Sequence, residues 1–320
     1  MLLTIASCLT IPIFGLAIVE FRPDMWCAGL TVLGTLIIVL RDPRETRNSV
    51  IAGAIFAAAL LMKPTFGPLI VVLFGAAFVL RVGPEIRSAK DLKSSAKSVL
   101  ILGGITLLLA APYFILGRQH LIDYYRLNVF GSAAALWTPN LSAINSALYY
   151  ILGPGGNATL GKWVYIGIPA VAFISLRSWR IGVLILISYL VVTLPGNKSP
   201  YLGMIFNAYV VAAIVLMMYW LLTITNPAIG YAIAGVFLVF GLATYHLPWG
   251  PPGSSLGVAE ARQKLNADVV SVLLSDSAIE QKIIYIPVIA SYLNGDSIVF
   301  SALQAGHRCR SGGGWKMKAA

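Results

Sequence analysis

Charged side chains are scarce in this sequence of 320 residues. They make up 11% of the composition, whereas a soluble domain carries about 25%. Apolar residues reach 58%, and the mean hydropathy is +0.83. This balance excludes a water-soluble fold for most of the chain and predicts a protein that spans a bilayer. Because the apolar runs are unbroken rather than alternating, they favour helices over the strands of a membrane barrel.

The chain also lacks the motifs of several common chemistries. Its three cysteines and three histidines show no metal-ligand spacing, so they predict neither a metal site nor a disulfide framework. No P-loop, dinucleotide-binding glycine motif or Ser/His/Asp arrangement occurs. Met1 leads directly into an apolar run, so no signal peptide is predicted. The net charge of +11 does not indicate nucleic-acid binding, because much of the excess falls in short loops between apolar segments.

Apolar segments of helical length fill the first 246 residues. They predict an all-α polytopic membrane protein with about nine transmembrane helices. Two of the segments are shorter than an untilted crossing requires, so their ends are less well defined. The predicted spans are Leu2–Val19, Met25–Leu40, Val50–Met62, Gly67–Leu80, Val99–Leu116, Trp163–Ile174, Ile181–Leu194, Ile205–Thr223 and Ala228–His246.

Basic residues are shared unevenly between the loops, which predicts the direction of the chain. With the N-terminus inside, three compact inside loops hold Arg41, Arg44, Arg47, Arg81, Arg87, Lys90, Lys93, Lys97, Arg177 and Arg180. The outside loops hold only Arg22, Lys63, Arg118, Arg126, Lys162 and Lys198. We therefore expect a multi-pass protein of a bacterial inner membrane, with the N-terminus inside and the C-terminus outside.

Two segments interrupt the pattern of spans. Residues 117–162 form a long external loop whose aromatic side chains indicate a structure at the membrane surface. Residues 247–320 begin with a Pro/Gly/Ser linker and continue as a small extramembrane α/β segment, with a helix near Glu260–Leu274 and a strand over Lys282–Ile289. The basic, glycine-rich end, His307–Ala320, is predicted to be disordered. The chain is thus expected to have a transmembrane domain, 1–246, and an external segment, 247–320.

The first predicted outer turn, Glu20–Asp24, carries two carboxylates on either side of Arg22. Ionisable groups close to a span are costly to place, which makes them candidates for function. Asp24 can cap the positive N-terminal end of the second helix, or it can be a carboxylate held near a polar substrate. Both interpretations stay open, and Glu20 is a second candidate for the substrate role.

Lys63 lies between two apolar spans, where Pro64 forces a break. Its ammonium can be an interfacial anchor that reaches water, or it can hold a lipid-linked phosphate as a point charge. Lys198 and Tyr201, in another predicted outer turn, have the same two interpretations. Three weaker candidates open the long external loop: Arg118, His120 and Arg126.

The order of short motifs resembles that of one group of membrane enzymes. Phe21–Asp24 opens a span, Ala52–Ala54 leads into Leu60–Thr65, and Gly196–Tyr201 precedes a late span. These segments are similar to the "R-x-D", "aGl", "l-t-K" and "G-K-x-P-x-Y" elements of polytopic glycosyltransferases with the GT-C fold. That group includes the dolichyl-phosphate-mannose protein mannosyltransferases and the lipid A aminoarabinose transferases. The resemblance covers most of Phe21–Asp296.

The resemblance implies transfer of a sugar from a polyprenyl-phosphate carrier to a lipid, glycan or protein acceptor on the external face. In such enzymes a carboxylate of the first external loop is the base, and cationic side chains hold the carrier phosphate. Lys63, Lys198 and Tyr201 match the phosphate-holding positions, and Arg22 is a further candidate. Asp24 matches a polar residue at the mouth of an early span. A divalent metal is the one cofactor that the resemblance leaves open.

The chain departs from this family in its first external loop. The catalytic acid of the family lies in a long loop, whereas the corresponding turn here is only Glu20–Asp24. We expect either that the sequence is a piece of a longer protein, which is favoured, or that Glu20 or Asp24 has taken over the role. Two other functions stay open: a non-catalytic relative, and a transporter or flippase of a lipid-linked saccharide. The absence of an internal repeat and of midplane charges disfavours the transporter.

Overall fold

The chain divides into two units, Met1–Pro248 and Trp249–Ala320, in the computed structural model. The predicted boundary, between residues 246 and 247, lies two residues earlier. The residues that the structure describes are 6–7, 9–14, 23–131, 138, 140–196, 198, 200–224, 227–244, 268, 271, 308–310 and 316–318.

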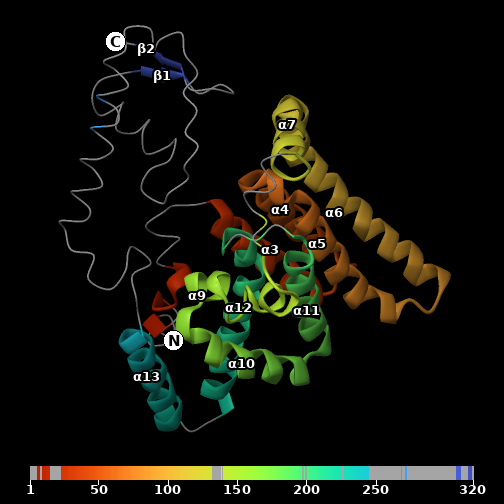
Figure 1. The fold of residues 1–320 in the computed structure, drawn as a ribbon. Coiled ribbons are helices and arrows are strands. Elements are labelled where there is room, and N and C mark those ends of the chain that lie inside the picture. The colour runs from red at the N-terminus through yellow and green to blue at the C-terminus, as the bar shows by residue number, and fades with distance from the viewer. Residues whose placement is uncertain are drawn as a thin grey trace. The chain divides into compact units, whose positions relative to one another are not determined.

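The first unit is built from helices (Figure 1). The longer ones are α3 (Pro23–Leu40), α4 (Thr46–Met62), α5 (Gly67–Val82), α6 (Ala89–Leu116), α10 (Val164–Arg177), α11 (Trp179–Thr193), α12 (Pro200–Ile224) and α13 (Pro227–Thr244). The shorter ones are α7 (Arg118–Asn128), α8 (Ala143–Leu148) and α9 (Pro154–Thr159), with single 3-10 turns at Pro64–Phe66, Gly83–Glu85 and Gly161–Trp163.

Eight of the nine predicted spans coincide with a helix. Among the described residues, four segments are long and apolar enough to cross a membrane: Pro23–Leu40, Pro64–Glu85, Ala89–Leu116 and Tyr201–Thr223. The prediction of an all-α membrane protein is therefore confirmed in this coarse form, whereas nine crossings remain a prediction. The first predicted span, Leu2–Val19, lies largely outside the described residues. The segment predicted to be a long external loop is mostly helical where it is described, because α7, α8 and α9 all fall within residues 117–162.

Helix α3 joins the two halves of this unit. It packs against α4, α5 and α12, and α5 also contacts α11, beside which it lies in Figure 1. The close approach to α5 depends on Gly34, where a Cβ would lie 2.4 Å from Phe74. The contact with α12 includes a hydrogen bond of 2.7 Å between the buried hydroxyls of Thr35 and Tyr209.

Helices α4 and α6 approach each other backbone to backbone. A Cβ at Gly53 would lie 2.7 Å from the carbonyl oxygen of Leu102, and Thr106 donates a hydrogen bond of 3.1 Å to the carbonyl oxygen of Gly53. Without a hydrophobic driving force between helices in lipid, small residues and such hydrogen bonds provide the helix contact. The Ala52–Ala54 motif therefore has a packing role.

One carboxylate joins three turns at one end of the unit. Glu85 pairs with Arg44 after α3, with Arg81 of α5, and with Arg180 of α11, whose Nη2 lies 3.5 Å from Oε1. Asp42 pairs with Arg44 at 3.0 Å. Burial alone would raise the pKa of Asp42, but hydrogen bonds from Arg44 hold it below its ordinary value. The three loops that the sequence places on one side of the membrane thus meet at one end of the unit.

In the second unit, the structure describes two short strands, β1 (Arg308–Arg310) and β2 (Lys316–Lys318). They pair antiparallel, with Cys309 opposite Met317. These strands lie in the stretch His307–Ala320, for which the sequence predicts disorder. The predicted strand at Lys282–Ile289 and most of the predicted helix at Glu260–Leu274 lie outside the described residues.

The contact between α4 and α6 gives a first testable expectation. Gly53→Ala should destabilise the protein by about 1–3 kcal/mol, because the added methyl group overpacks a backbone contact. Gly103→Ala is the matched control on α6, since a Cβ there meets nothing within 4 Å and alanine favours the helix. Thermal unfolding in detergent measures both. Equal melting of Gly53→Ala and the parent protein would contradict the close packing.

Candidate functional site

Two of the sequence-predicted residues, Asp24 and Lys63, form an ion pair. The Lys63 Nζ lies 3.1 Å from the Oδ1 of Asp24. The Asp24 side chain is only 4% exposed, whereas that of Lys63 is 28% exposed. The Lys63 ammonium also lies 5.5 Å from the centre of the Phe66 ring, a cation–π contact. An anion arriving from outside can therefore reach the lysine but not the aspartate.

Local sequence explains why these two groups meet. Pro23 and Asp24 begin α3, so the carboxylate lies at the positive end of the helix dipole. Helix α4 ends at Met62 because Pro64 cannot continue it, and Lys63 takes a non-helical backbone conformation before the Pro64–Phe66 turn. Since α3 and α4 are antiparallel neighbours joined by a short turn, the start of α3 lies beside the end of α4.

A groove of about 880 Å³ lies beside this break, between the start of α5, the end of α6 and α7. Leu60 and Pro64 contribute to its wall next to Lys63, and Arg118 and Arg126 of α7 are among its lining residues. Its remaining lining residues are Gly67, Pro68, Val71, Phe114, Leu121, Ile122, Tyr125 and Phe130. The wall is almost wholly apolar, which suits the hydrophobic part of a ligand.

Helix α7 is held over the break by one hydrogen bond. The Tyr125 hydroxyl donates to the carbonyl oxygen of Thr65 at 2.8 Å. Burial, with a smaller contribution from Tyr124, raises the pKa of Tyr125, so its hydroxyl stays protonated and remains a donor at neutral pH. The Tyr125 contact thus fixes the arginines of α7 relative to Lys63. His120 lies on the exposed part of the same helix, and Asp123 accepts a hydrogen bond from Gln119 at 2.9 Å.

Lys198 contacts a different part of the structure. Its ammonium donates to the carbonyl oxygens of Thr193 and of Pro195, the second at 2.7 Å, and lies 5.8 Å from the ring of Tyr150. Lys198 therefore satisfies carbonyls at the C-terminal end of α11, where a cation is favourable. Burial lowers the pKa of Lys198. Tyr201 follows in the first turn of α12 and is half-buried.

Not all predicted candidates can be placed. Glu20 and Arg22 lie outside the described residues. Within the part of the chain that the structure describes, no group of three His, Cys, Asp or Glu side chains could hold a metal ion. Sequence reasoning missed the Tyr125–Thr65 contact and the groove. The available signal was the Pro64 break followed, after two spans, by a short helix with an arginine near each end.

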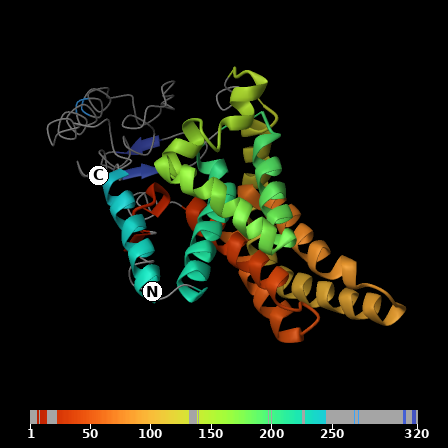
Figure 2. The same ribbon diagram turned by 90° about the horizontal axis from the view of Figure 1, so that it is seen from below.

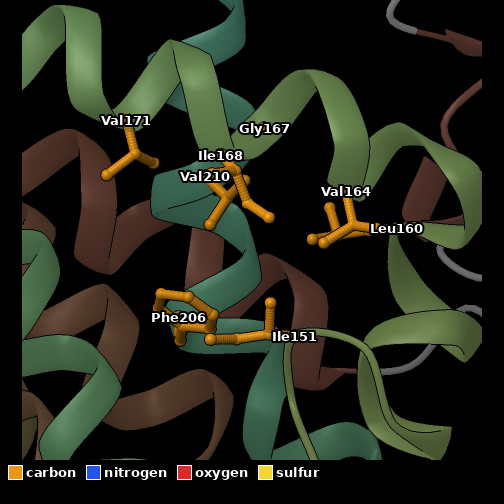
Figure 3. Close-up of a pocket in the computed structure, with 8 residues that line it drawn as sticks. All are labelled: Ile151, Leu160, Val164, Gly167, Ile168, Val171, Phe206 and Val210. Atoms are coloured by element: carbon orange, nitrogen blue, oxygen red, sulfur yellow. The ribbon is translucent and has the colours of Figure 1, made fainter. Parts of the chain in front are cut away.

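A second, smaller cleft of about 150 Å³ lies between α10 and α12 (Figure 3). It is lined only by apolar residues: Ile151, Leu160, Val164, Gly167, Ile168, Val171, Phe206 and Val210. Gly167 allows α12 to come close, since a Cβ there would lie 2.5 Å from Val210. With no polar side chain in its lining, this cleft offers no group for catalysis.

The ion pair gives an asymmetric stability prediction. Lys63→Met should cost on the order of 3 kcal/mol, because it leaves the carboxylate of Asp24 buried and uncompensated. Asp24→Asn should cost less, since the partly exposed lysine can reach water. The double variant Asp24→Asn/Lys63→Met should recover most of the loss. Chemical denaturation of the three variants measures the coupling, with Arg47→Met as the control at an exposed cation. Additive losses in the double variant would show that the two groups do not interact.

Comparison of the chain with protein-family models, with curated proteins and with solved structures gives no match. The likeness to GT-C glycosyltransferases therefore rests on the motifs of the sequence alone. What the structure adds is geometric: a paired carboxylate and ammonium, an adjoining apolar groove, and two arginines on its wall.

Proposed function

We propose that this chain is a membrane glycosyltransferase, or part of one, that takes a sugar from a polyprenyl-phosphate carrier. The observation that carries the proposal is the position of the groove beside Lys63. A lipid chain needs an apolar seat, and its phosphate needs cations at one end of that seat. The groove of about 880 Å³ would provide the first. Lys63, at the adjoining break, and Arg118 and Arg126, in the groove lining, would provide the second.

The chemistry requires a base and a stabilised leaving group. The acceptor hydroxyl oxygen attacks the sugar carbon that is bonded to the carrier phosphate, and the bond between that carbon and the phosphate oxygen breaks. The electron pair of the broken bond stays on the phosphate, and the hydroxyl proton passes to a base. Lys63 and the two arginines would stabilise the phosphate as it gains charge. Lys198 and Tyr201 keep their proposed role at the same phosphate only if the α11–α12 turn rearranges, because Lys198 is held by backbone carbonyls.

The described carboxylate at this site is poorly placed to be the base. Asp24 is the described carboxylate beside Lys63, but it is buried and neutralised by that lysine. Such a group cannot reach an acceptor hydroxyl while the pair is intact. The same observation favours a second candidate function, a non-catalytic relative that binds the carrier without transferring its sugar. We propose that the 320-residue chain alone binds carrier but is inactive or nearly so.

The topology proposed for this function has nine crossings of a bacterial inner membrane. The N-terminus lies on the inner side of that membrane. The groove and the Asp24–Lys63 pair then face outward, where the acceptor lies. The arginine cluster around Glu85 faces inward, in agreement with the positive-inside rule.

Carrier binding tests the role of Lys63. The double variant Asp24→Asn/Lys63→Met should bind a polyprenyl monophosphate tenfold or more weakly than the parent chain, since losing a hydrogen bond to a charged group costs about 1.5–3 kcal/mol. Arg47→Gln, at the other end of α4, is the control. The variant Lys63→Arg should recover only part of the affinity, because the planar guanidinium has a different geometry. Unchanged affinity in the double variant would leave Lys63 as an anchor alone. Robust sugar transfer by the 320-residue chain would contradict its proposed inactivity.

Cysteine labelling of intact cells tests the topology. With the native cysteines replaced, a cysteine at Gln119 should react with an impermeant reagent, whereas one at Ser88 should not. These positions lie at opposite ends of α6, and both are exposed. The reverse pattern would invert the orientation, and labelling of both sites would show that α6 does not cross the membrane.

A further inference from the structure

One face of helix α6 carries lysines in its first turns and exposed apolar side chains further along. Lys90, Lys93 and Lys97 fall within about 60° of one another at 100° per residue, so they form one stripe along its first turns. All three side chains are exposed. Continuing along the same side of the helix, the stripe leads to Leu100, Leu108 and Ile115, which are 74%, 71% and 65% exposed. One face of one helix therefore passes from lysine to exposed leucine and isoleucine.

This face turns away from the rest of the unit. The residues of α6 that pack on α4 lie on the opposite side: Ser95, Ser98, Leu102 and Thr106. Only 11% of the apolar window of α6 is buried inside the protein. In both views the N-terminal turns of α6 extend beyond the neighbouring helices (Figures 1 and 2). Lipid is therefore the natural neighbour of the apolar part of this face.

The border between the lysine stripe and the apolar stretch of α6 indicates how deep each part lies in the membrane. The apolar stretch Val99–Leu116 is about 27 Å long at 1.5 Å per residue, close to the thickness of a hydrocarbon core of about 30 Å. Lys97 then lies at the surface of the core. Lys90 is about 10 Å further along the axis, so the three ammonium groups span the layer of lipid headgroups. Asp91, the acidic residue among them, is engaged with Ser88 and with the backbone N–H of Arg87 at the start of the helix.

We propose that the stripe Lys90–Lys93–Lys97 is a binding surface for anionic phospholipids of the leaflet that it faces. The lysines would contact the phosphates of the headgroups, and Leu100 and Leu108 would contact the acyl chains below. Each lysine near an anionic surface contributes about 1 kcal/mol, or about fivefold in affinity. This surface is independent of the carrier site at Lys63, which lies beyond the other end of α6 and involves a different class of lipid.

The test measures binding of phosphatidylglycerol and phosphatidylcholine to the purified full chain in neutral detergent by native mass spectrometry. The parent chain should prefer phosphatidylglycerol, and added salt should weaken the preference. The triple variant Lys90→Gln/Lys93→Gln/Lys97→Gln should lose about 100-fold of the phosphatidylglycerol affinity. The matched triple variant with arginine at the three positions should keep it. Melting temperatures of both variants establish that they are folded.

Three outcomes would overturn the proposal. The first is an unchanged preference in the glutamine variant, and the second is an equal loss in the arginine variant. The third is full competition by soluble glycerol phosphate, which would show that the surface takes a free phosphate rather than a lipid. Asp24→Asn/Lys63→Met should keep the phosphatidylglycerol preference, so failure of the carrier proposal and failure of this one give different results.

Discussion

A membrane-spanning helix must be long enough to cross the hydrocarbon core. This length constrains where charged residues lie in most of this structure. On α6 the uncharged stretch from Val99 to Leu116 is about 27 Å long, and charged residues resume at Arg118. At one boundary lie Lys97 and the arginines around Glu85, and at the other lie the Lys63 break and the arginines of α7. These charged groups therefore lie at two levels, whereas the stretch of α6 between them carries no charge.

At both levels the charged side chains form ion pairs, but the two sets of pairs differ in composition. Around Glu85, three guanidinium groups share one carboxylate, so positive charge remains in excess. Beside Lys63 the pairing is one to one, and the carboxylate is the more deeply buried partner. The first arrangement suits a surface that faces anionic headgroups. The second leaves the cation partly exposed, so an anion that bound it would compete with Asp24.

The sequence predicts the elements well because their signals are local. A run of apolar residues is sufficient for α3 to α6 and α10 to α13, and Pro64 marks the break that Lys63 occupies. The pairing of Asp24 with Lys63 is not local, since 39 positions separate them in the chain. It depends on α3 and α4 being antiparallel neighbours of matched length, which hydropathy cannot report. The sequence did not predict helix α7, for a similar reason. Its mixed composition resembles a loop, and its contact with the Pro64–Phe66 turn, which includes the hydrogen bond from Tyr125 to Thr65, is not local in the sequence.

The Asp24–Lys63 pair also links stability to function. A buried carboxylate without its lysine is strongly unfavourable, so the fold favours keeping the pair closed. A carrier phosphate bound at Lys63, as proposed, would weaken that attraction and leave Asp24 without its counterion unless another group compensated. The cost of opening the pair is then subtracted from the affinity for the carrier. An anion that binds here must therefore bring enough apolar contact to offset this cost, and the groove of about 880 Å³ beside Lys63 is where a lipid chain can provide it. A small free phosphate lacks such a chain, which is the physical reason to expect selectivity for a lipid-linked one.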